Sequence, residues 1–491
     1  MLKNLLTIAA LSALTFSAVS CISQRRATAG KRAYNITTYG AKPGGQDLCT
    51  DKIQKAVDTC SREGGGRVVI PEGVWLTGTL VLKDNVELHL ASGATVQGST
   101  NHVDYPTFHP GYRSHKDING FNALIYAEKA ANIALTGNGV IDGRGSDQRP
   151  RDGTQFRGDT DGRPRNILLI SCKNVRVDGI SMKNSGVWNQ HYLNCEDLLI
   201  ENIRVYNHAN RNNDGIDIDG CRRVVFRNSV IDSDDDGICL KSTGPAACEY
   251  VTISNCTASS HCNAIKTGTE STGGFKHVQI SDIVVKPCAP EGKVVYGRAE
   301  GITGITVGCV DGGICEDITI RDITIEGTLS PIFVRLGKRN RPHTPGAEVT
   351  ADSTMSNIVI SNVTATGCGD WGCAILGLPG NPIQNLQLRD ITLSFAGGGT
   401  EEDSKREIKE GLTSYPQPTA WGKLPAYGLF IRNVNAISLK NISMKTVQED
   451  ARPPVWLENI EGAVLSDVKA NGARVATEQI IRRNVSASHE K

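Results

Sequence analysis

A short stretch that recurs along this 491-residue chain constrains its fold more than any other feature. Copies begin at four cysteines spaced by 23, 26 and 27 residues: Cys172, Cys195, Cys221 and Cys248. Six more copies begin at Phe275, Cys315, Met355, Ile383, Val434 and Ile460. Self-similarity at a period of about 20 to 50 residues is typical of repeat proteins, in which each repeat packs against its neighbours.

Each copy alternates apolar and polar residues, as in CKNVRVDGISMKNSG from Cys172, and pauses at a turn of Asn, Asp or Gly. The pattern predicts a strand, a turn and a second strand, with no helical spacing. Coils of such strands can stack about 4.8 Å apart and pair in parallel. We therefore predict an all-β, right-handed parallel β-helix that forms a single domain over residues 34–491.

The stretch 50–66, TDKIQKAVDTCSREGGG, places apolar residues at helical spacing instead. Four of them share one face: Ile53, Ala56, Val57 and Cys60. Thr50 is the expected N-cap, and the glycines that follow end the helix. Because an open solenoid end needs a cover, this segment is predicted to be an N-terminal capping helix.

Two long polar stretches, 99–165 and 396–425, do not repeat and are predicted to be loops that wall a groove. Tyr415, Trp421 and Tyr427 lie in or beside the second stretch and offer rings on which sugars can stack. Loops that close one end of a groove favour exo-action or short oligosaccharide substrates.

The first 21 residues, MLKNLLTIAALSALTFSAVSC, have a basic start, a short apolar run and small residues before Cys21. They predict a secretory signal peptide with a bacterial lipobox-like end, so Cys21 is the expected lipidation site; plain secretion is the alternative. Residues 22–33 are predicted to be a tether. We expect an exported periplasmic, outer-membrane or cell-surface lipoprotein whose membrane contact is this anchor alone, and we expect a monomer.

Fourteen further cysteines remain, and export permits disulfides. The close pairs are Cys49/Cys60, Cys309/Cys315 and Cys368/Cys373. The alternative is that many are small buried residues stacked on one another. No CxxC pair occurs and histidines do not cluster with the cysteines, so no zinc site is predicted.

The chain balances 53 Lys and Arg against 52 Asp and Glu, which argues against a nucleic-acid partner. Acids are concentrated locally, in RNNDGIDIDG (211–220) and DSDDDGICLK (232–241). Asp214 and Asp235 are 21 residues apart, and Asp235 and His261 are 26 apart, about one coil each. We expect these residues to stack on successive turns, with carboxylates roughly 6.5 to 9.5 Å apart around a water.

Four explanations compete for this cluster. Turn stacking explains several polar residues well, namely Asn212, Asn213, Asp217 and Asp219, but not the consecutive acids 234–236. An EF-hand fails because its twelfth position is Thr243, although calcium held in another geometry by a lyase stays open. The others are inverting glycoside hydrolysis, which needs one acid and one base, and a glycan-binding β-helix without chemistry.

The segments NNDGIDI, SDDDGICLKS and SSHCNAIKTGTES resemble, in order and spacing, the catalytic segments of glycoside hydrolase family 28, the polygalacturonase type. GNGVIDGRG (137–145) and NSGVWNQHYLNC (184–195) are also similar, and the resemblance covers most of residues 34–470. It implies that Asp235 is the general acid, that Asp214 and Asp236 hold and activate the water, and that His261 tunes the acid. It implies no cofactor and no metal.

Further residues are expected to contact substrate or to support the site. Lys241 and Lys266 lie a few residues beyond catalytic positions, where structural pairing is the alternative. Trp188 and His191 on the preceding coil form a possible sugar platform or a packed turn. Asn213 is expected to be a substrate contact or a stacking residue.

Two departures from the family concern specificity. The usual Gly-His-Gly reads Ser260-His261-Cys262, and the Arg-Ile-Lys segment that binds a substrate carboxylate is missing from 297–313. The candidates to replace this clamp are cations expected on neighbouring coils: Arg298, Arg335, Lys338 and Arg339.

The sequence thus predicts an inverting glycoside hydrolase for a pectin-like polysaccharide or its oligosaccharides. Polygalacturonan, rhamnogalacturonan and other decorated glycans stay open as substrates. The alternatives are a calcium-dependent polysaccharide lyase on the same fold and a non-catalytic glycan-binding protein.

Overall fold

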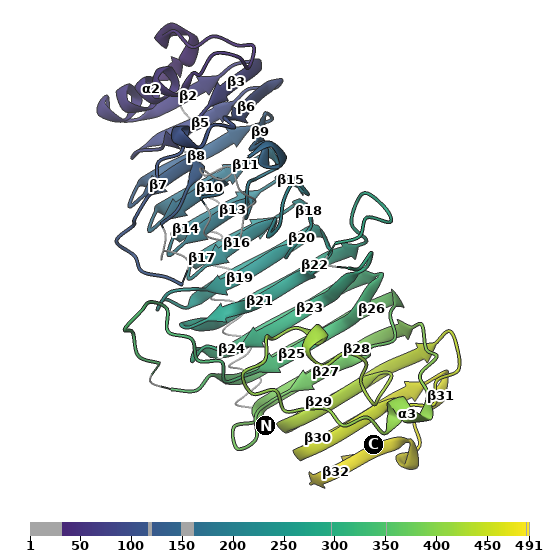
Figure 1. Ribbon diagram of the computed structural model, residues 1–491. Helices are drawn as coiled ribbons and strands as arrows, with labels where there is room; N and C mark the ends of the chain where they lie inside the picture. The colour runs from purple at the N-terminus through teal and green to yellow at the C-terminus, as the bar shows by residue number, and fades with distance from the viewer. Residues whose placement is uncertain are drawn as a thin grey trace.

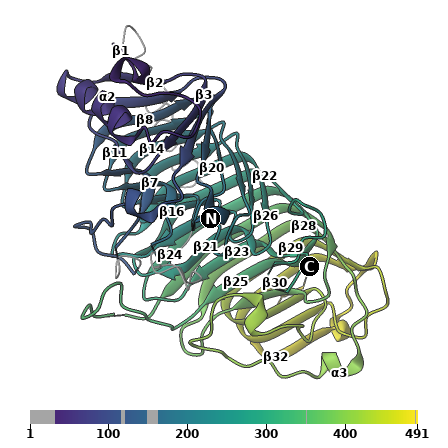
Figure 2. The same ribbon diagram turned by 45° about the horizontal axis from the view of Figure 1, so that its top comes forward.

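A computed structural model describes residues 32–115, 120–148, 162–295, 297–349, 351–487 and 489–490. The chain winds as a right-handed parallel β-helix, as predicted, with strands stacked along one long axis (Figure 1). The turned view in Figure 2 shows the same stack. The predicted signal peptide, Cys21 and all but the last two residues of the tether lie outside the described residues.

Three columns of strands form the coils. The column that carries the site contains β4 (Leu80–Val81), β7 (Ala123–Glu128), β10 (Arg165–Ile170), β13 (Gln190–Leu193), β16 (Ile216–Asp219), β19 (Ile238–Ser242), β21 (Asn263–Ser271), β23 (Gly301–Cys309), β25 (Thr328–Leu336), β27 (Cys373–Leu376), the start of β29 (Leu429–Thr446), the start of β30 (Val455–Ala470) and β32 (Ile480–Ser486).

The second column contains β1 (Ala33–Asn35), β2 (Gly66–Ile70), β5 (Val86–Leu90), β8 (Ala131–Gly137), β11 (Lys173–Asp178), β14 (Glu196–Glu201), β17 (Arg222–Arg227), β20 (Cys248–Ser260), β22 (Gly274–Lys286), β24 (Ile314–Glu326), β26 (Thr354–Cys368) and β28 (Ile383–Phe395). The third contains β3 (Gly73–Thr77), β6 (Ala94–Gly98), β9 (Val140–Asp142), β12 (Ser181–Lys183), β15 (Arg204–Asn207) and β18 (Val230–Ser233). From β20 onward, single long strands run through the second and third columns. Two short strands, β31 (Ala473–Arg474) and β33 (His489–Glu490), pair with β30.

The core consists of ladders of like residues, because parallel pairing places equivalent positions of successive coils above one another. One ladder inside the site column is Ile216, Ile238, Ile265, Ile305 and Ile332. All five are at most 1% exposed. Removing such apolar surface from water, at roughly 25 cal/mol per Å², stabilises the stack and fixes its register.

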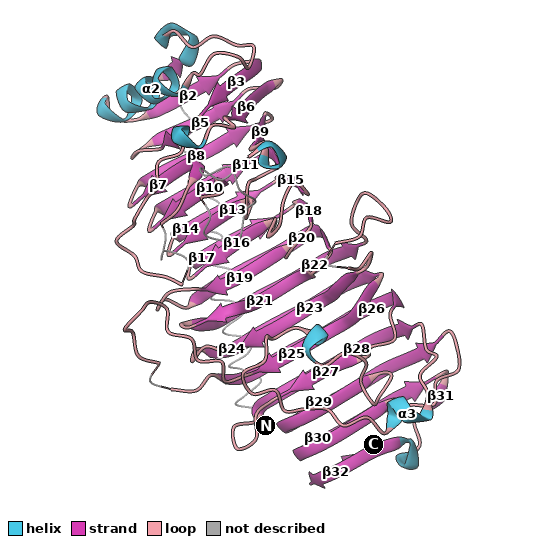
Figure 3. Cartoon of the chain, viewed as in Figure 1, coloured by secondary structure: helices cyan, strands magenta, loops and turns pink. Residues whose placement is uncertain are grey.

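The predicted capping helix is α2 (Thr50–Arg62), which covers the N-terminal end of the solenoid (Figure 3). Its four predicted apolar residues are all buried. The N-cap prediction is wrong: Cys49 is the N-cap, and Thr50 is the first helical residue. The Thr50 hydroxyl instead accepts a hydrogen bond from the Gly78 amide at 2.8 Å, which ties the helix to the first coil.

The predicted disulfides do not form, since every cysteine among the described residues is free and all but Cys288 are buried. Register places Cys195 between Cys172 and Cys221, with Cys248 on the next coil. The Cys221 sulfur accepts a hydrogen bond from the Cys195 amide at 3.3 Å. The alternative interpretation, stacked small buried residues, is therefore confirmed for this set.

The loop prediction is wrong for one of the two long polar stretches and correct for the other. The stretch 99–165 contains β7, β8 and β9, so it includes a full coil that the sequence pattern did not reveal. The stretch 396–425 is a loop as predicted, with only α3 (Glu401–Ser404) and the short 3-10 turn η4 (Pro418–Ala420) in it. Other 3-10 turns are η1 (Ile36–Tyr39), η2 (His102–Asp104), η3 (Gly145–Asp147) and η5 (Thr477–Gln479). Within the described ranges, no helix is long and apolar enough to cross a bilayer.

Candidate active site

The acidic segments meet on one face because they precede consecutive strands of one column. Asp217 of β16, Cys239 of β19 and Lys266 of β21 are register partners. Asp214 therefore lies one coil before the pair Asp235 and Asp236, as predicted. The next coil brings His261 into the same region, which confirms the expected stacking on three successive turns.

The three carboxylates approach more closely than expected. One oxygen each of Asp214, Asp235 and Asp236 lies within 4.8 Å of the others, not the roughly 6.5 to 9.5 Å predicted. The reason is that Asp235 and Asp236 are consecutive and Asp214 is only one strand spacing away. A single water can still bridge such a gap, because two hydrogen bonds of about 2.8 Å span it.

The chain bends so that both consecutive acids reach this face. The Asp236 amide donates to Oδ1 of Asp235 at 3.0 Å, and the Gly237 amide donates to the Asn263 carbonyl at 2.9 Å. Gly237 is needed there for close approach, since a Cβ at this position would lie 2.7 Å from the Ala264 carbonyl oxygen. The chain bends here because the neighbouring coil approaches closely.

Asp236 is held ionised. Its Oδ2 pairs with Lys266 Nζ at 2.7 Å, and its Oδ1 accepts from the Asn263 amide at 2.6 Å. Burial raises the pKa of Asp236, but Lys266, Lys241 and the Asn263 hydrogen bond outweigh burial, so the pKa is lowered overall. A buried carboxylate with a lowered pKa suits the role of a base.

Lys241 is the central cation of the cluster. Its Nζ lies 3.5 Å from Asp214, 3.4 Å from Asp217, 4.0 Å from Asp236 and 3.9 Å from Glu270. The side chain is only 4% exposed. Burial lowers its pKa, yet the surrounding carboxylates raise it well above the usual value, so the lysine stays charged.

Asp214 and Asp217 have raised pKa values. For Asp214, burial is the main cause, followed by repulsion from Asp217 and Asp235. Burial likewise raises the pKa of Asp217 to about 7, although the Lys241 charge opposes the shift. With Asp236 shifted the other way, the cluster contains proton-bearing and ionised carboxyls at the same pH.

Asp217→Asn is expected to flatten the pH dependence of stability. The folded pKa near 7 exceeds the ordinary value of 3.8, so the wild type loses stability as pH rises from about 4 to about 7. The neutral variant avoids this cost and should be more stable above that window by about 2 to 4 kcal/mol. Urea denaturation at pH 4 and pH 8 measures the difference. The control is Asp467→Asn, at an exposed ion pair, which should keep the wild-type change of unfolding free energy with pH. If D217N showed the same change with pH as wild type, the raised pKa of Asp217 would be contradicted.

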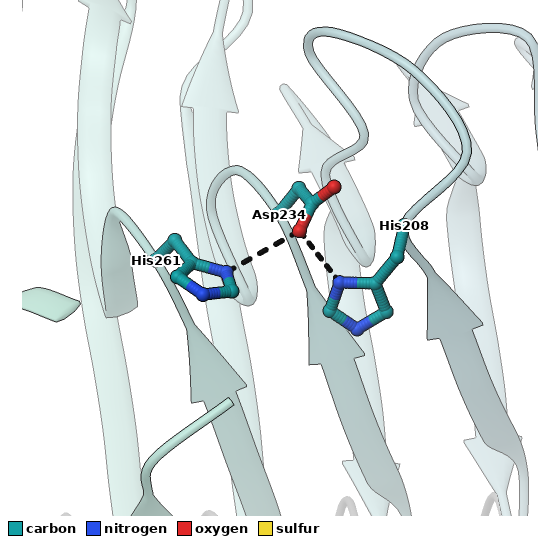
Figure 4. Close-up of side chains that lie close together, drawn as sticks. All are labelled: His208, Asp234 and His261. Carbon is teal, nitrogen blue, oxygen red and sulfur yellow. Dashed lines mark hydrogen bonds and ion pairs between the residues drawn. The ribbon is translucent and has the colours of Figure 1, made fainter. Parts of the chain in front are cut away.

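His261 and His191 are both buried and both pair with carboxylates. His261 Nδ1 lies 3.3 Å from Oδ1 of Asp234, while His191 Nε2 lies 2.9 Å from Oδ2 of Asp219. Burial lowers the pKa of His191 to about 4. His191 is 0% exposed and His261 is 2% exposed, and Figure 4 shows the contact of His261 with Asp234.

The predicted substrate contacts divide into two groups. Lys241 and Lys266 lie among the carboxylates. Trp188 is only 3% exposed, with Lys241 over its ring at 4.6 Å and the His191 ring against it at 4.9 Å. Asn213 is buried and donates its amide to the Val187 carbonyl at 2.8 Å. Packing accounts for Trp188, His191 and Asn213 in this structure.

The cations considered as a carboxylate clamp are mostly engaged elsewhere. Arg335 donates to the Gly411 carbonyl at 2.9 Å, and Lys338 pairs with Asp352 at 2.8 Å. Arg339 binds Asp311 at 2.8 Å. Arg298 lies over the Trp371 ring at 5.7 Å.

Two residues near the cluster, Glu270 and Arg341, were missed by sequence reasoning, and Tyr415, expected as a sugar-stacking ring, also lies there. Glu270 faces Lys241, and Arg341 pairs with Glu270 at 3.2 Å. Tyr415 receives a hydrogen bond from Thr269 at 3.0 Å and faces Lys266, whose Nζ is 5.8 Å from the ring centre. The even spacing of Lys266, Gly268 and Glu270 along β21 was a usable signal for Glu270, while nothing local marked Arg341.

Comparisons with known proteins bear on the family of this chain. The model for the family described as "Glycosyl hydrolases family 28" matches residues 60–413. A "Probable polygalacturonase" of Vitis vinifera is 26% identical over 436 residues, which cover 85% of this chain and 84% of the relative. An "Exo-poly-alpha-D-galacturonosidase" of Dickeya chrysanthemi is 30% identical over 257 residues, 43% of this chain and 42% of the relative.

Solved structures support the fold. A hyperthermoactive exopolygalacturonase from Thermotoga maritima matches with a TM-score of 0.65 at 21% identity, covering 94% of this chain and 97% of that one. A polygalacturonase from Erwinia carotovora matches with a TM-score of 0.58 at 17% identity, covering 83% and 97%. Because the family model spans most of the sequence, this chain belongs to glycosyl hydrolases family 28.

Proposed function

We propose that the protein hydrolyses α-galacturonan-type pectin, or a related uronate-containing glycan, with inversion at the anomeric carbon. The observation that carries the proposal is the meeting of Asp214, Asp235 and Asp236, whose oxygens lie within 4.8 Å, beside the buried cations Lys241 and Lys266. The similarity to a probable polygalacturonase and to an exo-poly-alpha-D-galacturonosidase supports galacturonan as the first substrate to test.

The roles follow from exposure and charge. Asp235 is the only partly exposed member of the three carboxylates, so it is placed to protonate the glycosidic oxygen as the departing sugar leaves. Asp236, kept ionised by Lys266, accepts a proton from a water that it holds together with Asp214. That water attacks the anomeric carbon from the opposite side, which inverts its configuration.

Exo-action is supported by the loop 396–425, which packs over the strands that follow the site. The Lys338 amide donates to the Leu412 carbonyl at 2.8 Å, and Arg335 binds the carbonyls of Glu410 and Gly411. Tyr415 of the same loop reaches β21 beside Lys266. A loop packed over the strands on the C-terminal side of the site favours binding of a chain end over binding of a long internal segment.

Export as a lipoprotein is a separate proposal. It rests on the apolar N-terminal run and the lipobox-like AVSC that ends at Cys21. Cys21→Ala is expected to release the protein from the membrane fraction of the expressing bacterium, as measured by fractionation and by the loss of the lipid mass. A variant that stays membrane-bound would contradict the anchor.

Reducing-end release from a panel of polygalacturonan, rhamnogalacturonan and neutral glycans tests the proposed function. We expect cleavage of a uronate-containing glycan with EDTA present throughout, and early release of monomers or dimers from chain ends. Cleavage that needs calcium and yields an unsaturated, ultraviolet-absorbing sugar would identify a lyase instead. Binding without cleavage across the panel would favour a glycan-binding protein.

A further inference from the structure

The third member of the acidic run, Asp234, has different partners from its two neighbours. Its Oδ1 lies 2.6 Å from Nδ1 of His208 and 3.3 Å from Nδ1 of His261 (Figure 4). Its Oδ2 lies 2.6 Å from Nζ of Lys293. Asp234 is 6% exposed, so these contacts take place out of bulk water, where each is stronger than at the surface.

His208 is held between two carboxylates. Nδ1 faces Asp234, and Nε2 lies 3.0 Å from Oδ1 of Asp232. Burial lowers the pKa of His208, but its hydrogen bonds to both aspartates outweigh burial and raise the pKa overall. A doubly protonated ring can donate to both carboxylates at once, which a neutral imidazole cannot do.

Lys293 brings a second cation from the connection between β22 and β23. Its Nζ contacts both Asp234 oxygens, at 2.9 and 2.6 Å, and the His208 carbonyl at 3.3 Å. Burial alone would raise the pKa of Asp234, but His208, His261 and Lys293 hold it below its usual range. Asp234 is therefore a carboxylate that accepts hydrogen bonds and does not supply protons.

These contacts argue against a metal centre, although two histidines and an aspartate stand together. The Lys293 ammonium already neutralises the negative charge of the Asp234 carboxylate, which a bound metal ion would otherwise do. The 2.6 Å contact between Asp234 and His208 is a hydrogen-bond distance, shorter than the roughly 3.3 Å between two ligands of a tetrahedral ion with bonds of about 2.0 Å.

We propose that Asp234 is a positioning residue whose carboxylate, 3.3 Å from Nδ1 of His261, draws the ring proton to that nitrogen and so fixes the ring and its tautomer, leaving Nε2 for the acid site. His208 and Lys293 keep Asp234 ionised for this task. The same logic orients histidines in hydrolases that use an aspartate behind the imidazole. The inference deepens the proposed function, and its kcat test rests on that function. It gives Asp235 and Asp236 roles in the reaction and gives Asp234 a positioning role.

The groups that surround this unit come from several elements. They are Asp232 on β18, Tyr206 on β15 with its ring 4.4 Å from that of His208, Cys288 and Lys293 after β22, and His261 before β21. Replacing Asp234 removes the one carboxylate that touches both histidines.

Asp234→Asn is expected to lower kcat about 10- to 100-fold on the cleaved glycan, with KM within about threefold, because the ring loses its fixed orientation. Lys293→Met leaves Asp234 and His261 in place and should lower kcat less, about two- to fivefold. The matched control is Asp317→Asn, which breaks a more exposed aspartate–histidine pair, with His277 at 3.1 Å, and should leave kcat unchanged.

Nitrogen NMR of histidine-labelled protein gives a readout that does not depend on activity. His261→Gln assigns the His261 signals; in wild type we expect a protonated Nδ1, and in D234N a mixture of tautomers at the same pH. If the wild type cleaves nothing, the proposed function fails while this spectrum still tests the positioning role. Unchanged His261 signals in folded D234N, or a D234N kcat within twofold of wild type, would overturn the inference. If D234N does not fold, a wild-type His261 whose Nδ1 carries no proton at the same pH would overturn the inference.

Discussion

Asp235→Asn is expected to lower kcat by about 10³-fold while binding of the glycan changes little, because asparagine keeps the shape but cannot protonate the glycosidic oxygen. Asp235 is the partly exposed carboxyl of the cluster, and its loss leaves Asp236 with Lys266 intact. The measurement is steady-state reducing-end release, with circular dichroism to confirm the fold. Loss of activity through KM alone would point to a binding role.

The matched control for this variant is another turn aspartate of the solenoid. Asp282 has a φ of 57° and is exposed, so it represents the purely structural use of Asp at β-helix turns. Asp282→Asn should leave kcat unchanged. If Asp235→Asn and Asp282→Asn behaved alike, with full activity, the acidic cluster would be structural and the chemistry would lie elsewhere.

Lys241→Met is expected to cost about 3 to 5 kcal/mol of unfolding free energy, since it leaves buried carboxylates without their central cation. Lys241 lies within 4.0 Å of four of them, including Asp214 and Asp217. Denaturant unfolding above pH 7 should show the largest loss, and lower pH should restore part of it because the carboxyls can then be neutralised by protons.

The surface pair of Lys338 and Asp352 supplies the comparison. Their N–O distance is 2.8 Å, but the side chains are 50% and 37% exposed, so water screens the pair. Lys338→Met should change stability by no more than about 1 kcal/mol. Equal losses in the two variants would show that Lys241 is not the electrostatic centre of the site.

The fold and the acid cluster were predictable because a solenoid converts sequence period into spatial stacking. Once the coil length was known, Asp214, Asp235 and His261 had to fall on neighbouring turns. Alternation along β19 and β21 placed Lys241 and Lys266 on the same face. The closer carboxylate approach follows from two consecutive acids that lie one strand spacing from Asp214, and the period alone did not reveal it because a local bend at Gly237 brings both acids to this face.

Other features depend on contacts between segments far apart in the chain, which no local sequence pattern predicts. Arg341 and Tyr415 come from loops far along the chain, and only the docking of those loops brings them to Glu270 and Lys266. Trp188 was expected to be available for sugars, but it is 3% exposed, with Lys241 over its ring and the His191 ring against it. The coil formed by β7, β8 and β9 was overlooked because it lies inside a long polar stretch.

The stereochemistry of hydrolysis tests the central claim most directly. Proton NMR of the first product formed from the cleaved glycan reports the configuration of the new reducing end before mutarotation. A water held by Asp214 and Asp236 predicts that the first product has the anomeric configuration opposite to the linkage cut, with no unsaturated sugar. Retained configuration would mean that a carboxylate attacks the anomeric carbon itself, and an unsaturated product would mean elimination; either result contradicts the account.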